Sequence, residues 1–127
     1  MQSQTTRTAK ITLMAEGYME VRILAEVVQT LQDARDNLRT AITLTGGIRR
    51  PVLLNLTQAV PLEPEVRHHY KGQVMVDSFT ALGIQVDNSP LGIIMGNIYL
   101  SIARPGIPTR LFTASQDPLP WILGHRK

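Results

Sequence analysis

The sequence predicts a single α/β domain with a mainly parallel β-sheet, one antiparallel hairpin at the edge of that sheet, and helices packed against it. In the first part of the chain, apolar and polar residues alternate, as they do in strands with one exposed face. Farther along the chain, stretches whose apolar residues have helical spacing alternate with short apolar runs. This alternation is typical of βαβ units with right-handed crossovers. The expected order of elements is ββαβαβαβα, and a length of 127 residues suits one domain.

Two alternating stretches near the N-terminus predict the hairpin. They are Lys10 to Met14 and Tyr18 to Leu24, and the loop between them ends at Gly17. Glycine can adopt the positive φ that tight hairpin loops require. We expect the polar residues 1–8, which precede the hairpin, to be flexible.

A capping signature marks the first helix. Thr30 is a good N-cap, and Asp33 three residues later completes an approximate capping box. Apolar residues then follow helical spacing until Gly46, where we expect the helix to end. The apolar run from Val52 to Leu56 does not alternate, and it therefore predicts a central strand that is covered on both faces.

The second half of the chain continues the alternation of helices and strands. Pro64 suits the first position of a helix, where its missing N–H breaks no helical hydrogen bond, and Ser89 followed by Pro90 suits the start of another. The expected elements are a helix from Glu63 to about Gly72, a strand from Phe79 to Val86, a helix from Ser89 to about Ala103, a strand from Thr109 to Thr113 and a short terminal helix capped by Ser115.

The composition excludes several classes of site. The chain has no cysteine, which rules out disulfides, thiol nucleophiles and thiolate metal sites. The basic residues behind the net charge of +3 are scattered and aromatic residues make up only 5%, whereas nucleic-acid binding favours a dense basic face with interleaved aromatic side chains. We therefore expect no nucleic-acid partner.

Two segments decide the expected location. The polar N-terminus lacks the apolar core of a signal peptide. The longest apolar stretch, around Leu91 to Ile102, is interrupted by polar residues and is shorter than the roughly 20 residues of a membrane span. We expect a cytoplasmic protein without membrane insertion.

The order of elements and the turn from Leu54 to Val60, which follows the central strand, resemble the STAS fold of bacterial anti-sigma-factor antagonists. A more specific set of segments resembles a branch of small bacterial STAS-like and SEC14-like proteins, namely Gly96 to Leu100, Arg104 with Pro105, Pro108 to Phe112 and Trp121 to Leu123. The resemblance extends from about Gly17 to Leu123, nearly the whole chain. It implies a STAS-like fold and a regulatory role in protein binding.

The same resemblance implies a place for a regulatory switch. In that family, a serine at the start of the helix after the central strand is phosphorylated by a partner kinase, and a helix N-terminus favours such an anion. Here that place holds Glu63, Pro64 and Glu65, and Thr57 lies earlier, in the turn. We therefore expect no phosphorylation between Glu63 and His69. The two carboxylates either imitate the phosphorylated state permanently or simply complement the helix dipole.

We expect the partner-facing surface to lie on this second helix, which starts at the sheet edge where α/β folds place their sites. The expected partner-binding residues are Glu63, Glu65, Arg67, His68 and His69. Adjacent residues on a helix point about 100° apart, so His68 and His69 cannot bind one metal ion together. No carboxylate has a suitable spacing to both histidines, and we expect no metal site.

Motifs of catalysis and of cofactor binding are missing from the sequence. There is no Gly-x-Ser-x-Gly nucleophile elbow and no glycine-rich phosphate-binding loop. The segment from Asp87 to Pro90 lies where open α/β sheets bind ligands, but helix capping by Ser89 accounts for it as well and is the explanation we favour. Three further serines also have structural explanations, as caps or as helix surface positions: Ser78, Ser101 and Ser115. We expect no enzymatic activity and no cofactor.

The predicted third helix is apolar around nearly its whole circumference, whereas a helix on a sheet needs only one apolar stripe. Gly92 and Gly96 would also let another backbone approach closely. The excess apolar surface predicts an oligomer interface or an apolar pocket at Met95, Tyr99 and Ile102, unless the terminal helix covers it.

Two functions from different classes follow from the sequence. The first is a non-enzymatic, STAS-like regulatory protein that binds a protein partner and forms a homodimer. The alternative is a carrier that holds an apolar small molecule or a lipid between the third helix and the sheet, as the SEC14-like resemblance implies. An enzymatic function is a third and minor hypothesis.

Overall fold

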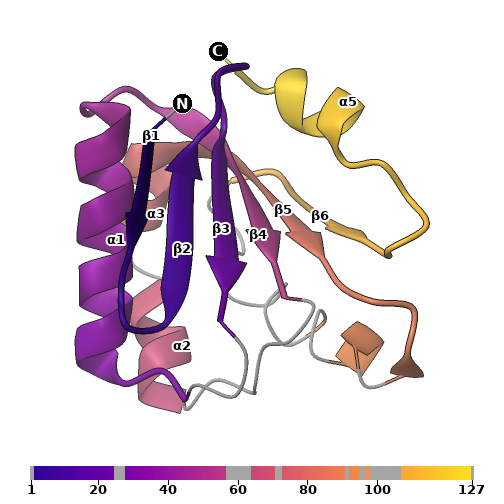
Figure 1. Ribbon diagram of the computed structural model, residues 1–127, viewed down its shortest axis with the longest axis horizontal. Helices are drawn as coiled ribbons and strands as arrows, with labels where there is room; N and C mark the ends of the chain where they lie inside the picture. Colours follow the sequence, from indigo (N-terminus) through magenta and orange to yellow (C-terminus); the bar gives the residue numbers. More distant parts are fainter. Residues whose placement is uncertain are drawn as a thin grey trace.

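The β-sheet of this protein has six strands whose order in space is the same as their order in the sequence (Figure 1). The computed structural model describes residues 2–24, 28–56, 64–70, 73–90, 92–94, 97 and 107–126. Its strands are β1 (Gln2–Thr5), β2 (Ala9–Leu13), β3 (Met19–Ile23), β4 (Arg50–Asn55), β5 (Phe79–Gln85) and β6 (Thr109–Phe112). β1, β2 and β3 are antiparallel neighbours, and β3 to β6 are parallel. The predicted α/β fold, with a mainly parallel sheet and an antiparallel edge, is confirmed.

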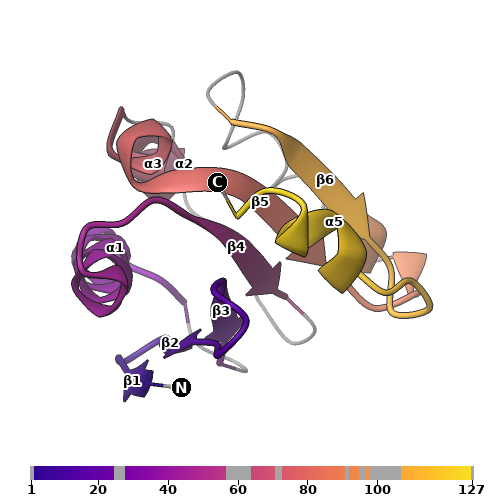
Figure 2. The same ribbon diagram turned by 90° about the horizontal axis from the view of Figure 1, so that it is seen from above.

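Helices cover both faces of the sheet (Figure 2). α1 (Leu31–Thr45), α2 (Pro64–Tyr70) and α3 (Gln73–Ser78) lie on one face, and α5 (Leu119–Leu123) lies on the other. The connections from β3 to β4 and from β4 to β5 each move one strand in the same direction across the sheet. Right-handed crossovers that move in one direction place their helices on the same face, which explains why α1, α2 and α3 lie together.

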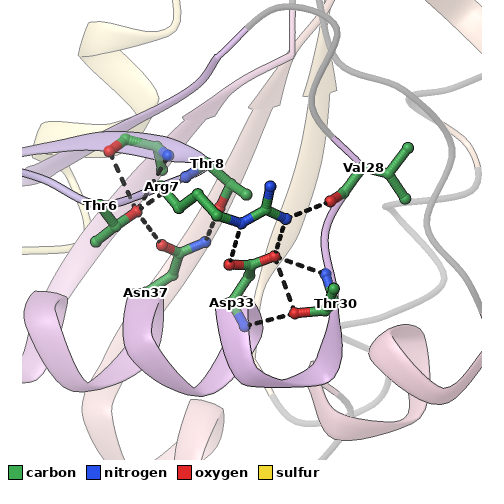
Figure 3. A network of polar contacts seen from close by, with 8 residues as sticks. Thr6, Arg7, Thr8, Val28, Thr30, Asp33 and Asn37 are labelled. Carbon is green, nitrogen blue, oxygen red and sulfur yellow. Dashed lines mark hydrogen bonds and ion pairs between the residues drawn. The ribbon is translucent and has the colours of Figure 1, made fainter.

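The helix α1 begins and ends where the sequence predicts. The Asp33 N–H donates a hydrogen bond to the Thr30 hydroxyl at 3.2 Å, and the Thr30 N–H donates one to the Asp33 carboxylate at 2.8 Å (Figure 3). Both halves of the capping box are therefore present. Gly46 ends the helix with a φ of 65°, in the left-handed region that favours glycine.

The N-terminal segment differs from the expectation of a flexible chain. Residues 2–5 form β1, which pairs with β2 and extends the hairpin to an antiparallel group of strands. All four side chains of β1 are exposed and polar. Without apolar alternation, the sequence carries no local signal for this strand, and its hydrogen-bonded pairing with β2 defines it.

Two helices also differ from the expectation. α3 was not predicted at all, because Val74, Met75 and Val76 follow one another without helical spacing, and Met75 alone among the three is buried. Ser115 does not cap α5, whose N-cap position is Pro118. The predicted third helix is described at 92–94, which are helical, whereas Met95, Tyr99 and Ile102 lie outside the described residues.

The hydrophobic core has two parts, one on each face of the sheet. The larger part fills the space between the sheet and the helices α1, α2 and α3. The smaller part lies under α5 and contains Tyr18, Leu53 and Ile122. α5 sits directly on β5 at Gly83, where an added Cβ atom would come within 2.7 Å of the Ile122 Cδ1 atom. The glycine therefore allows α5 to pack closely on the sheet.

Candidate functional site

The residues that the sequence assigns to partner binding lie in different surroundings. Glu65 and His68 are exposed on α2, whereas His69 is partly buried. Glu63 and the side chain of Arg67 lie outside the part of the chain that the structure describes. Of the described side chains in this set, His69 lines a groove between α1 and the two helices that follow β4.

This groove has a volume of about 350 Å³, and we call it the basic groove. α1 forms one wall, and α2 and α3 form the other. The residues that line it are Arg35, Leu38, Arg39, Ile42, Thr43, His69 and Val74. All the described residues that line it belong to helices, and none belongs to the sheet.

The floor of the basic groove is apolar. Leu38 is buried and Ile42 is partly buried, and both pack with the main core. Val74 contributes an apolar side chain that is 47% exposed. This side chain adds apolar contact area beside the polar residues of the groove.

The rim of the basic groove carries two arginines that belong to the same helix face. Arg35 and Arg39 are four residues apart on α1, and both are exposed. Arg39 has one weak ion pair, with Asp36 at 3.8 Å. In the described part of the chain, no carboxylate lies within ion-pair distance of Arg35. Like charges at this spacing destabilise a helix by about 0.2–0.5 kcal/mol, so the pair contributes nothing to the stability of α1.

His69 completes the rim from the side of α2. Burial and, in second place, the positive charge of Arg35 lower the pKa of the His69 imidazole. The imidazole is therefore neutral at neutral pH, and the permanent charges of the groove are those of Arg35 and Arg39. An anion bound between these arginines would favour the protonated form of His69.

The segment from Asp87 to Ser89, which the sequence offered as a second candidate, is a capping motif. The Asp87 carboxylate accepts hydrogen bonds from the Ser89 N–H at 3.0 Å and from the Ser89 hydroxyl at 2.5 Å. These bonds lower the pKa of Asp87. The Ser89 oxygen in turn accepts a hydrogen bond from the Gly92 N–H at 3.0 Å. The cap predicted at Ser89 is thus confirmed, and its polar groups are engaged with each other.

The described residues were also expected to lack a metal site and a membrane span. Within those ranges, no three His, Asp or Glu side chains gather closely enough to hold a metal ion. None of the helices described is both long and apolar enough to cross a membrane.

The two arginines of the basic groove are not among the partner-binding residues that the sequence predicts. Their signal was present as a like-charged pair four residues apart on the polar face of a well-capped helix. No local pattern predicts that His69 and Val74, which belong to two later helices, line the same groove as these arginines. The groove exists because the crossovers place all three helices on one face of the sheet.

Comparisons with known proteins give one family. The family model described as a domain of unknown function, DUF7793, matches residues 12–126, a range that includes every residue of the basic groove. No curated protein and no solved structure matches the chain. The match covers nearly the whole chain, and this protein therefore belongs to the DUF7793 family.

Proposed function

We propose that this protein is a non-enzymatic interaction module that binds an acidic segment of a protein partner in the basic groove. The observation that supports the proposal is the pairing of Arg35 and Arg39 beside an exposed apolar side chain, Val74. The like charges weaken the helix that carries them, and an acidic partner would remove that repulsion. The STAS-like resemblance, which implies regulation through protein contacts, agrees with such a role.

The chemistry of the groove specifies the partner segment. Arginine binds carboxylates through two parallel hydrogen bonds, which adds geometric specificity to the attraction between the charges. The apolar floor suits a leucine or a valine that lies between the acidic residues. A groove of about 350 Å³ holds only a few side chains, so we expect a weak and reversible contact, as is common in regulation.

The predicted partner-facing residues fit this proposal in part. His69 lies in the groove itself, whereas Glu65 and His68 point to a neighbouring surface of α2 that a longer partner segment would also touch. A negative Glu65 would repel acidic residues placed beside it, which restricts the direction in which the segment can lie.

A binding experiment with a defined probe tests the proposal. The probe is a synthetic peptide in which glutamates flank a leucine, and the matched peptide carries lysines in place of the glutamates. In NMR titrations of the labelled protein, we expect the acidic peptide to shift backbone resonances of α1 and α3 and the basic peptide to leave them unchanged. Binding should weaken as salt is added, because the attraction is between exposed charges.

Two variants distinguish binding in the groove from a general attraction of the acidic peptide to positive charges on the protein. Arg35→Gln combined with Arg39→Gln should lower the affinity for the acidic peptide by at least about tenfold, since a hydrogen bond to a charged group contributes about 1.5–3 kcal/mol. Arg22→Gln removes one exposed arginine from β3, far from the groove, and should leave the affinity unchanged. Equal losses in both variants, or shifts that map away from α1 and α3, would refute the proposal.

A further inference from the structure

A second cavity lies between the sheet and the helices α1 and α3, on the side of α1 that faces the sheet. It has a volume of about 70 Å³ and lies between α1, α3 and the strands β3, β4 and β5. The residues that line it are Val21, Ile23, Gln29, Asn37, Leu38, Ala41, Val52, Leu54, Met75, Phe79 and Leu82. These residues lie on α1, α3, the strands β3 to β5 and the segment before α1.

The arrangement of the helices explains this cavity. Among the described helices, α1 packs mainly on β2 and α3 packs on β5, so these two helices leave part of the strands between them uncovered. Val21 of β3 and Leu54 of β4 point to this face and are only partly buried. Ala41, the residue of α1 above the cavity, is itself buried but has only a methyl group with which to fill the space.

The size of the cavity exceeds that of an ordinary packing defect. Protein interiors contain few voids larger than a water molecule. A water needs about 10–15 Å³ of such volume, and the cavity has about 70 Å³. Met75 and Phe79 contribute large side chains to its walls, but they do not fill the space below Ala41.

The cavity wall is unsuited to water. The described residues that line it are apolar apart from Gln29 and Asn37. The Asn37 amide is engaged with the loop before β2, because its oxygen accepts a hydrogen bond from the Thr6 hydroxyl at 2.5 Å and its nitrogen donates one to the Thr8 hydroxyl at 2.9 Å (Figure 3). A buried water makes two to four hydrogen bonds to polar groups, and the apolar walls offer it none. An apolar guest would therefore displace water from these walls at little cost in hydrogen bonds.

We propose that this cavity is a binding site for a small hydrocarbon group, either a free apolar molecule of a few carbon atoms or the end of an acyl chain. The site shares Leu38 with the basic groove, but its variants Ala41→Val and Leu54→Ala leave Arg35 and Arg39 untouched. Failure of one proposal therefore does not affect the other. Both possible guests present a compact apolar group to the cavity. Its binding would remove apolar surface of Val21, Leu54 and Met75 from contact with water.

Xenon and hexanoate are the probes that test the site. Under xenon pressure, we expect saturable shifts of the methyl resonances of Leu38, Val52 and Met75 in ¹³C NMR spectra of the protein. If hexanoate gives the same pattern and competes with xenon, the natural guest is the end of an acyl chain. If xenon alone binds, the guest is a free small molecule. Absence of saturable methyl shifts with both probes would overturn the proposal.

Two variants change the cavity in opposite directions. Ala41→Val places a larger side chain in the space and should lower the affinity for xenon by about tenfold. Leu54→Ala enlarges the space and should raise the occupancy by xenon, so the test survives if Ala41→Val does not fold. Ala114→Val, the same change as at residue 41 but in an exposed turn, is the matched control and should bind xenon as the wild type does. Unchanged binding in both cavity variants would place the xenon elsewhere and refute the site.

Discussion

Arg7, in the loop before β2, forms a two-point ion pair with Asp33 in the first turn of α1 (Figure 3). The Nε atom of Arg7 donates to one carboxylate oxygen at 2.9 Å, and a terminal nitrogen donates to the other. A terminal nitrogen of Arg7 also donates to the Val28 carbonyl at 2.7 Å. Asp33 thus serves two purposes, because the same carboxylate caps α1 and holds the N-terminal loop against it.

The ion pair makes Asp33 a source of acid sensitivity. The hydrogen bonds from Arg7, followed by those from Thr30, hold the pKa of Asp33 well below its ordinary value of 3.8. Since the folded-state pKa is the lower one, the stabilisation is complete well above pH 3.8 and is lost as the pH falls below that value toward the folded-state pKa. We expect urea denaturation to show a smaller drop in unfolding free energy between neutral pH and about pH 3 in Asp33→Asn than in the wild type. Asp36→Asn, on the exposed side of α1, is the control, and identical acid losses in all three proteins would contradict this role of Asp33.

The hydroxyl of Thr30 caps α1, and its removal should lower the stability of the whole domain. We expect Thr30→Ala to decrease the unfolding free energy by about 1 kcal/mol, which is typical for the loss of an N-cap. The same substitution at Thr43, an exposed position late in the helix, should have little effect or a slightly favourable one, because alanine is the better helix former. Chemical denaturation of the two variants checks this difference, and equal losses would show that the cap is unimportant.

Close packing of α5 on β5 depends on the absence of a side chain at Gly83. A Cβ atom there would lie 2.7 Å from the Ile122 Cδ1 atom, inside the buried core under α5. We expect Gly83→Ala to lower the unfolding free energy by about 1–3 kcal/mol through overpacking. Ile122→Val removes the Cδ1 atom, so the double variant should be more stable than the sum of the two single changes predicts. A double-mutant cycle without such a favourable coupling would show that α5 does not rest on Gly83.

Self-association remains a prediction from the apolar third helix, and two of its described residues allow a test. Ile93 is 39% exposed and Ile94 is 57% exposed. A dimer interface would remove this apolar surface from water. If the protein forms a homodimer through this region, Ile94→Glu should shift it to the monomer in sedimentation experiments without unfolding it. Ile48→Glu changes an isoleucine that is 59% exposed at the end of α1 and should leave the association state unchanged. A wild-type monomer at high micromolar concentration would eliminate the interface.

The lowered pKa of His69 predicts how binding in the basic groove depends on pH. The charged groups that line the groove beside His69 are Arg35 and Arg39. Burial of the imidazole and, in second place, the charge of Arg35 disfavour its protonation, whereas a bound carboxylate would favour it. Binding should therefore be accompanied by proton uptake, and the affinity for the acidic peptide should rise as the pH falls from about 8 to about 6. Titrations at several pH values check this, with His69→Gln expected to remove the dependence. An affinity that falls over the same range would contradict the proposed contact with His69.

The sequence by itself determined those parts of the fold that carry a local pattern. The strands β2 and β3 follow from alternation and β4 from a continuous apolar run, because each pattern reflects how many faces of the strand are buried. The limits of α1 follow from Thr30, Asp33 and Gly46, whose backbone and side-chain chemistry acts within one turn of helix. Such signals involve residues that are close together in the sequence. They can therefore be recognised without knowing which elements pack together in the folded protein.

The tertiary structure alone decided the features that join distant segments. β1 exists because its polar backbone pairs with β2, and Arg7 forms an ion pair with Asp33 because the loop before β2 passes the start of α1. The basic groove and the apolar cavity arise between helices whose positions follow from the crossovers, not from their own periodicity. A local pattern records which side of an element is buried. It does not record which other element covers that side or how completely, and both candidate binding sites depend on that.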